Sequence, residues 1–410
     1  MPPENRDHAR PALSIAGMLI MVLLVGMGER MAERFLPIYL LALGAGAVVI
    51  GLLSALDDWL SALYSFPGGY LADRLGTKRS LLIFNLMAMT GFLIVILIPR
   101  WQAVIVGAAF FLSWTAISLP ATMKLVANVL PKHHRTMGIS AHSFIRRIPM
   151  AVGPVLGGTC IAIWGERTGV RIAFGVALVM AAVALVMQQL LIEEDRPGKG
   201  GAPRPRAEVS PFRVFGQMTP ALRSLLVADI LVRFCERIPY AFVVVWSMKV
   251  IAHPVSGPQF GILTAIEMAT AMAIYIPVAY LADRTRKKPF VVITFGFFTL
   301  FPLALLFCDS FVLLAAAFVL RGLKEFGEPT RKALIMDLAP EGQKAAMFGL
   351  YYLIRDLIVG AAALGGGLLW LISPAANFLV AFGFGVLGTL WFALRGRDLQ
   401  SPAQEESTTD

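Results

Sequence analysis

Tyr70-Leu71-Ala72-Asp73-Arg74 recurs, residue for residue, as Tyr280-Leu281-Ala282-Asp283-Arg284. Each copy ends a long apolar run and opens a short basic turn, which reads Leu75-Gly76-Thr77-Lys78-Arg79 after the first copy and Thr285-Arg286-Lys287-Lys288 after the second. The copies start at positions 70 and 280, so they lie 210 residues apart in a chain of 410. A repeat of half the chain is typical of a membrane-embedded helical bundle that arose by duplication, and not of a solenoid.

The likeness between the two halves extends beyond this stretch. Residues 51–74 lie over residues 261–284 without a gap, and ionisable residues inside the apolar runs recur at matched positions. The matched pairs are Glu29 with Glu236, Arg30 with Arg237, Asp57 with Glu267, and Arg146 with Arg355. The two halves therefore share one structural plan, charges included.

The composition is that of a chain dissolved in lipid. Hydrophobic residues make up 57% of the chain, charged residues 15%, and the mean hydropathy is +0.72, whereas a soluble domain carries about 25% charged residues. A helix needs about 20 apolar residues to cross a bilayer. Apolar runs of this order occupy residues 12–39, 46–72, 78–99, 102–129, 137–163, 169–192, 219–249, 258–282, 287–308, 310–338, 346–372 and 374–394.

These runs predict the fold class and its division into domains. We expect an all-α membrane protein with twelve transmembrane helices in two pseudo-symmetric six-helix bundles. The bundles are expected at 12–192 and 219–394, and the polar segment 193–218 is expected to be a cytoplasmic linker between them.

The net charge of +10 could indicate a nucleic-acid partner, but the placement of the basic residues argues against one. Of 36 lysines and arginines, 19 fall on one side of the predicted membrane, and only Arg100, Arg167, Arg171 and Lys249 fall on the other. Basic residues concentrate in the cytoplasmic segments of membrane proteins. We therefore predict a multi-pass protein of the cell (inner) membrane with both termini cytoplasmic, and no nucleic-acid partner.

The sequence shows no motif for a cofactor or for catalysis. Cys160, Cys235 and Cys308 lie in apolar runs and are spaced too widely for a metal-binding motif. No nucleotide-binding Gly-Lys-Ser/Thr loop and no Ser/His/Asp arrangement occurs. We expect no cofactor, no metal site and no enzymatic activity.

The turn after the first copy of the repeat carries a specific signature. Its pattern is a Gly, three residues, Asp-Arg, one residue, Gly and then basic residues, here Gly69, Asp73, Arg74, Gly76, Lys78 and Arg79. On these residues the chain resembles the major facilitator superfamily, and the resemblance covers nearly its whole length. It implies a cytoplasmic gating motif in which Asp73 accepts hydrogen bonds from its own turn and from a facing helix, holding the outward-open state.

The second copy of the gating motif is degraded. Asp283 and Arg284 are kept, but Ala279 and Arg286 replace the two glycines. The resemblance therefore implies that the second turn gates less tightly than the first.

A second stretch, in the run 137–163, is similar to a signature of exporters in this family that exchange substrate for protons. Gly153, Pro154, Gly157 and Gly158 match it, while Pro149 stands in the place of its leading glycine. Small residues at this spacing also let helices approach closely. The glycines at 365–367 show that close packing alone produces such a run, so the stretch is either a marker of antiport or a helix-packing motif.

The matched charged residues form the candidate central site: Glu29, Arg30, Asp57, Arg146, Glu236, Arg237, Glu267 and Arg355. Ionisable groups inside a membrane are costly and usually functional, and the sites of duplicated transporters lie near the bilayer midplane. A buried carboxylate can also carry a proton. The competing interpretation is that these residues form salt bridges that only stabilise each bundle.

Together these features predict a secondary active transporter of a small organic molecule that works by alternating access. We favour proton-coupled efflux, with protons as the coupling ion. The alternative is an importer or exchanger of organic anions that uses Arg30 and Arg237 as a paired clamp. The expected partners are the lipid bilayer and the substrate, and we expect a monomer.

Overall fold

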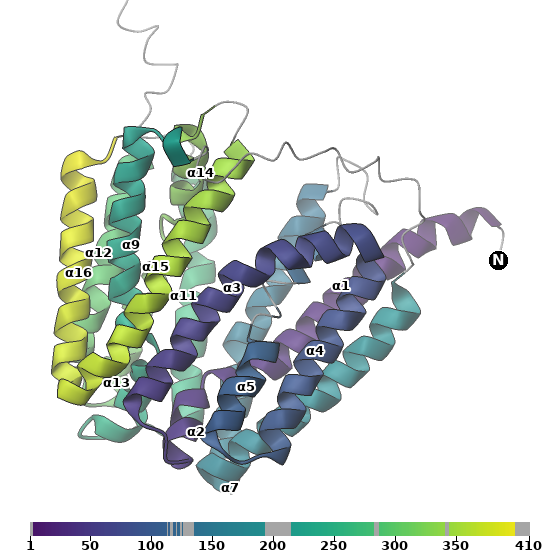
Figure 1. The fold of residues 1–410 in the computed structure, drawn as a ribbon, viewed down its shortest axis with the longest axis horizontal. Helices are drawn as coiled ribbons and strands as arrows, with labels where there is room; N and C mark the ends of the chain where they lie inside the picture. Colours follow the sequence, from purple (N-terminus) through teal and green to yellow (C-terminus); the bar gives the residue numbers. More distant parts are fainter. Residues whose placement is uncertain are drawn as a thin grey trace, which may run out of the picture. The chain divides into compact units, whose positions relative to one another are not determined.

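The computed structural model describes residues 3–112, 114, 118–119, 121–123, 125, 135–192, 215–282, 287–340 and 344–397. These residues are helices and short connections, with no strand among them, as the sequence predicts (Figure 1). The chain forms two compact units, Met1–Arg206 with Val255–Ala265 and Ala207–Pro254 with Ile266–Asp410.

The helices of the first unit follow the predicted apolar runs, with breaks at defined residues. They are α1 (Pro3–Glu33), α2 (Leu36–Ala42), α3 (Ala47–Leu75), α4 (Thr77–Leu97), α5 (Trp101–Phe111) and α7 (Arg135–Leu191). The predicted run 12–39 is thus divided between α1 and α2. In α7, Gly165 has φ +77° and separates two helices that meet there, because this backbone conformation cannot continue a helix.

The core of the first unit holds an aromatic cluster and a polar one. Phe92, Phe111 and Phe174, from α4, α5 and α7, meet pairwise with ring centroids 5.4–5.8 Å apart. The Asn85 side-chain amide donates to Gln188 Oε1, and Asn85 Oδ1 accepts from the Trp114 indole N–H at 2.8 Å. Satisfied hydrogen bonds of this kind join helices in a membrane, where apolar contact alone gives little preference for one partner over lipid.

Two helices of the second unit, α9 and α16, begin at capping residues that the sequence identifies. It contains α9 (Pro220–Tyr240), α10 (Phe242–Val245), a π-helix (Trp246–Val250), α12 (Lys287–Leu305), α13 (Phe311–Leu323), α14 (Glu328–Leu338), α15 (Lys344–Ile372) and α16 (Pro374–Arg395). The two units divide within α11 (Gly257–Ala282). Thr219 and Ser373 cap α9 and α16 by accepting hydrogen bonds from Leu222 N and Ala376 N, and a proline follows each cap.

The predicted run 310–338 is one continuous stretch, whereas the structure breaks it between α13 and α14. Glu328 and Pro329 begin α14, and proline suits the start of a helix but interrupts its interior. The Gly327 N–H in the break donates to the Thr294 hydroxyl, and the Phe326 ring stacks on Phe290 at 5.5 Å. A hydrogen bond and a ring contact to α12 therefore stabilise the break between α13 and α14.

Seven helical spans in the described part of the chain are long and apolar enough to cross a membrane. They are Leu13–Glu33, Ala47–Tyr64, Thr77–Leu97, Phe144–Leu191, Lys287–Leu305, Met347–Ile372 and Pro374–Arg395. The longest, Phe144–Leu191, contains the break at Gly165 and so holds two helices. Helix α9 is not among the seven, because it carries several charged residues.

Candidate functional site

Four of the predicted site residues lie together in the first unit. Glu29 and Arg30 stand on α1, Asp57 on α3 and Arg146 on α7. Glu29 is buried, and Arg30, Asp57 and Arg146 all act electrostatically on its carboxyl group. Arg30 also pairs with Glu33 one turn further along α1, with Nη1 2.7 Å from Oε2. The first unit thus holds a buried carboxylate among charged groups of both signs.

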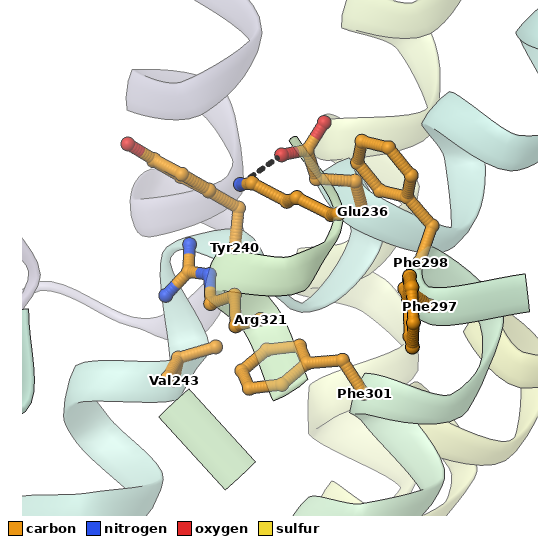
Figure 2. Close-up of a pocket in the computed structure, with 8 residues that line it drawn as sticks. Glu236, Tyr240, Val243, Phe297, Phe298, Phe301 and Arg321 are labelled. Atoms are coloured by element: carbon orange, nitrogen blue, oxygen red, sulfur yellow. Dashed lines mark hydrogen bonds and ion pairs between the residues drawn. The ribbon is translucent and has the colours of Figure 1, made fainter. Parts of the chain in front are cut away.

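In the second unit, Glu236 of α9 is held from two sides. Arg233 Nη1, one helical turn earlier, lies 2.6 Å from Glu236 Oε2. Lys324 Nζ, from the break after α13, lies 2.8 Å from Glu236 Oε1 (Figure 2). Both contacts are charge-assisted hydrogen bonds, which are stronger than neutral ones.

Lys324 also reaches Glu267 on α11. Its Nζ lies 3.4 Å from Glu267 Oε1, and Arg321 Nε lies 3.3 Å from the same oxygen. Glu267 is only 1% exposed. The structure therefore brings the predicted carboxylates Glu236 and Glu267 together through Lys324, a residue outside the predicted set.

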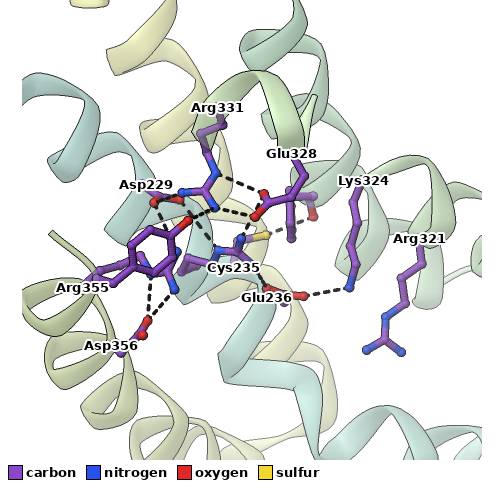
Figure 3. A network of polar contacts seen from close by, with 12 residues as sticks. Asp229, Cys235, Glu236, Arg321, Lys324, Glu328, Arg331, Arg355 and Asp356 are labelled. Atoms are coloured by element: carbon purple, nitrogen blue, oxygen red, sulfur yellow. Dashed lines mark hydrogen bonds and ion pairs between the residues drawn. The ribbon is translucent and has the colours of Figure 1, made fainter. Parts of the chain in front are cut away.

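A second group of contacts surrounds Asp229 on α9, and we call it the Asp229 cluster. Arg331 of α14 pairs with Asp229 and also with Glu328, at 2.6 Å (Figure 3). The Tyr351 hydroxyl of α15 donates to Asp229 Oδ2 at 3.0 Å. Arg233 Nη2 lies 3.3 Å from Glu328 Oε2, so Arg233 links the Asp229 cluster to Glu236.

The two remaining predicted arginines of the second unit pack on tyrosines. The Arg355 guanidinium lies 4.2 Å from the Tyr352 ring centre and donates to Asp356 at 2.8 Å, while its Nη1 is 3.6 Å from Asp229 Oδ2. The Arg237 guanidinium lies 4.8 Å from the Tyr240 ring centre. Such cation–π contacts are favourable where the cation is shielded from water. Arg355 therefore borders the Asp229 cluster.

The predicted set omits seven residues that hold Glu236 and Glu267 or form the Asp229 cluster: Asp229, Arg233, Arg321, Lys324, Glu328, Arg331 and Tyr351. For the charged residues among them a signal exists in the sequence. Positions 229, 233 and 236, and positions 321, 324, 328 and 331, follow helical spacing of three to four residues inside apolar runs. That spacing places their side chains on one face of a helix. For Tyr351 the sequence offers no comparable signal.

A small pocket opens beside Glu236 and Arg321 (Figure 2). Aromatic rings form much of its wall, and the charged ends of three side chains lie among them. The lining residues are Glu236, Tyr240, Val243, Phe297, Phe298, Phe301, Arg321 and Lys324. Apolar walls with a few convergent polar groups are typical of binding sites for small organic molecules, but here the free space is only that of about one water molecule, so a substrate would have to separate the walls. Within the described ranges, no group of three or more His, Cys, Asp or Glu side chains could hold a metal ion.

The gating motif lies at the end of α3 and the start of α4. Gly76 joins the two helices with φ +84°, which favours glycine there. Arg74 donates to the Tyr70 hydroxyl at 3.3 Å and Lys78 donates to the Gln189 carbonyl oxygen at 2.7 Å, while Arg79 is exposed on α4. Gly69 and Asp73 lie in α3, but their side-chain surroundings, like residues Asp283 and Arg284, lie outside the described part.

The glycines of the run 137–163 lie where α7 crosses other helices of the first unit. A Cβ added at Gly157 would lie 1.9 Å from the Met31 carbonyl oxygen, and one at Gly153 would lie 2.8 Å from the Arg30 Cβ. A Cβ at Gly158 would lie 2.1 Å from the carbonyl oxygen of Gly257, at the start of α11. Pro154 is inside the helix, one residue after Gly153. Close approach of backbones at these positions requires residues without a side chain.

Comparison with known proteins gives a consistent result. The model of the Major Facilitator Superfamily matches residues 18–249 and 225–409. Over 362 residues the chain is 22% identical to an uncharacterized MFS-type transporter of Methanocaldococcus jannaschii, covering 86% of this chain and 87% of the relative. Over 212 residues it is 23% identical to the quinolone resistance protein NorA of Staphylococcus aureus, covering 50% of this chain and 53% of the relative.

The structural comparison agrees with the sequence comparison. The solved structure of the nucleoside transporter NupG aligns with a TM-score of 0.76 at 13% identity, covering 93% of this chain and 100% of that chain. The likeness confirms the predicted fold class, an all-α membrane protein with the major facilitator fold. With the family model matched along nearly the whole chain, this integral membrane transporter belongs to the Major Facilitator Superfamily.

Proposed function

We propose that this transporter exports a small organic molecule in exchange for protons, by alternating access. The observation that carries the proposal is the pocket of the second unit, where aromatic walls surround Glu236 and Lys324. An aromatic wall suits the apolar body of an organic substrate, and the charged groups fix its orientation.

Proton coupling is supported by the way the carboxylates are held. Glu236 and Glu267 are neutralised by Lys324 and by one arginine each, Arg233 and Arg321. When Lys324 moves away, each carboxylate keeps its arginine but loses part of the positive charge that favours its ionised form. Movement of Lys324 would therefore change the affinity of these carboxylates for protons, which is what coupling requires.

Export is supported by the likeness to NorA, which is named for quinolone resistance. A membrane transporter confers resistance when it lowers the internal concentration of a compound. The likeness covers half of this chain, so it supports the direction of transport and leaves the substrate to be measured.

The alternative, an importer or exchanger of organic anions, receives less support from the contacts of Arg30. Its guanidinium already pairs with Glu33 at 2.7 Å, so a substrate anion would have to displace a carboxylate from the same helix. The Arg237 guanidinium packs on Tyr240.

The test is flux in proteoliposomes that contain the purified full-length protein. A fluorescent quinolone is loaded, and its movement is followed with and without an imposed pH gradient. We expect transport against the quinolone gradient only when the pH gradient is present. Glu236→Gln and Glu267→Gln should abolish the pH-driven component while leaving exchange without a gradient, because Gln mimics the protonated carboxyl group.

A matched control is Asp309→Asn, because Asp309 is an exposed carboxylate in the turn between α12 and α13. This variant should transport as the wild type does. If the pH gradient changes neither the rate nor the extent of transport for a panel of organic cations, anions and neutral compounds, proton-coupled export is wrong.

A further inference from the structure

Among the described residues that line the pocket, Lys324 is the cation that two carboxylates share most closely. Its Nζ lies 2.8 Å from Glu236 Oε1 and 3.4 Å from Glu267 Oε1. Each carboxylate also has an arginine of its own, since Arg233 lies 2.6 Å from Glu236 and Arg321 lies 3.3 Å from Glu267. If the Lys324 ammonium leaves, each carboxylate keeps its arginine. The site then has one positive charge fewer, the one that both carboxylates shared.

Lys324 is also the most movable of these cations. It lies in the break between α13 and α14, outside both helices, whereas Arg233 projects from the interior of α9. A lysine carries a compact ammonium with three donors on a flexible four-carbon stem, while an arginine binds through a rigid planar fork. The lysine can therefore exchange partners at lower cost than either arginine.

The aromatic faces of the pocket already hold cations of the protein itself. The Lys324 Nζ lies 5.7 Å from the Phe298 ring centre, and the Arg321 guanidinium lies 5.5 Å from the Tyr240 ring centre and 5.1 Å from that of Phe301. The faces of aromatic rings carry partial negative charge, so they attract a cation and repel an anion. An incoming anion would also have to separate Glu236 or Glu267 from the cations that hold them.

We infer that Lys324 is a built-in competitor that occupies the ammonium position of the substrate. Once its walls separate, the pocket would take an organic cation with an aromatic body, whose positive charge displaces Lys324 from Glu236 while its rings pack on Phe297 and on the face of Phe298 that Lys324 leaves. The inference rests on the proposed function in taking this pocket as the substrate site. It adds the class of substrate and gives Lys324 the role of setting its affinity.

Binding of two dyes of similar shape tests the inference. Rhodamine 6G is a xanthene cation and fluorescein is a xanthene anion, and fluorescence anisotropy with the full-length protein in nanodiscs measures both. Lys324→Met removes the ammonium and keeps most of the stem. We expect it to bind rhodamine 6G about tenfold more tightly than the wild type, with no gain for fluorescein.

Lys332→Met is the matched control, because Lys332 is 52% exposed on α14 and does not line the pocket. It should bind both dyes as the wild type does. Lys324→Arg keeps a positive charge and should not tighten rhodamine 6G binding. Unchanged or weaker rhodamine 6G binding by Lys324→Met, or loss of fluorescein binding in that variant, would overturn the inference.

A rescue experiment covers the case in which Lys324→Met folds poorly. Lys324→Ala leaves room for a small amine, so n-propylammonium should raise the Tm of this variant, while n-propanol and propionate should not. If n-propylammonium raises the Tm of the wild type equally, or does not raise the Tm of Lys324→Ala, the proposed role of Lys324 is wrong.

These binding and melting measurements need no pH gradient, so they separate the two proposals. If flux proves independent of protons while Lys324→Met still tightens rhodamine 6G binding, the proposed coupling is wrong and the role of Lys324 stands. If flux is driven by protons but Lys324→Met binds the cation no better, the role of Lys324 is wrong and the coupling stands.

Discussion

At the scale of single residues, Asp229 shows how the second unit accommodates charge in a membrane. Its side chain is 1% exposed, and it accepts from Arg331 and from the Tyr351 hydroxyl. Isolated charges at such depth are costly, but a charge that is paired and hydrogen-bonded is tolerated. The carboxylate of Asp229 therefore serves as the common acceptor for α14 and α15.

Asp229→Asn should destabilise the protein because Arg331 is 1% exposed and would lose one of its two carboxylates. Removing one partner of a buried pair costs about 3–5 kcal/mol, and we expect the lower end because Glu328 remains. Tyr351→Phe removes one hydrogen bond and should cost about 1 kcal/mol. Thermal melting of the purified variants checks both values, and a Tm of the Asp229→Asn variant equal to that of the wild type would contradict the role of Asp229.

The site residues show what sequence could and could not give. The matched pairs pointed to Glu236 and Glu267, which the structure places around Lys324. Lys324 has no matched partner in the first half, so a comparison of the halves does not single it out. In the Asp57-Asp58 pair, Asp58 is the buried one, and burial depends on which neighbours pack there, which a charge pattern does not reveal.

At the scale of helices, close crossings depend on single glycines. A Cβ at Gly366 of α15 would lie 2.2 Å from the carbonyl oxygen of Ile238 on α9. The Asn377 amide of α16 donates to that oxygen at 3.3 Å and to the Gly366 carbonyl oxygen at 2.8 Å. One side chain thus joins three helices at a close crossing of two of them.

Gly366→Ala should push α15 away from α9 and destabilise the second unit by about 1–3 kcal/mol. Gly365→Ala is the matched control in the same helix, because a Cβ there meets nothing within 4 Å. The control should melt at the temperature of the wild type or slightly above it, since alanine favours a helix. If the two variants have the same Tm, the contact between α15 and α9 does not depend on glycine at position 366.

The two gating turns differ in sequence, and this difference predicts unequal effects of substitutions at Asp73 and Asp283. The first turn keeps both motif glycines, and Gly76 has φ +84°, whereas the second turn has Ala279 and Arg286 at these places. We expect Asp73→Asn to reduce transport more than Asp283→Asn, with little change in melting temperature. Initial rates of uptake into proteoliposomes check this, and equal losses in the two variants would argue against a dominant first turn.

The element boundaries show a second limit of sequence reasoning. Length alone makes 310–338 one predicted span, although its second half carries charged residues and Pro329, and the structure has two helices there, α13 and α14. Gly327 and Pro329 mark the break, but membrane helices also tolerate proline when neighbours satisfy the freed backbone groups. Here the Thr294 hydroxyl, from another helix, satisfies the Gly327 N–H, and only packing could reveal that partner.

At the scale of the whole molecule, the repeated stretch at 70–74 and 280–284 and the apolar runs were enough to predict the family fold. Orientation in the membrane stays a prediction from the unequal distribution of basic residues. The three native cysteines are buried, so a thiol reagent should find little background to label.

Cysteines introduced singly at Gly200 and Ala403 test that orientation. Both positions belong to segments that we predict to be cytoplasmic. In intact cells they should resist an impermeant maleimide added outside, and they should react after the membrane is permeabilised. Labelling of either from outside, with a cysteine at Lys249 as the externally exposed reference, would reverse the predicted orientation.

The charges of α9 also bear on the biosynthesis of the chain. Asp229, Arg233, Glu236 and Arg237 make α9 a poor candidate for partitioning into lipid alone, at roughly 2.5–3.5 kcal/mol for each charge near the bilayer centre. The partner of Asp229 on α14 is 102 residues further along the chain. At about 5–20 residues per second, the ribosome needs on the order of 5–20 s to supply it. During that interval nascent α9 has no Arg331, so we expect it to stay beside the insertion machinery or at the membrane surface until α14 emerges.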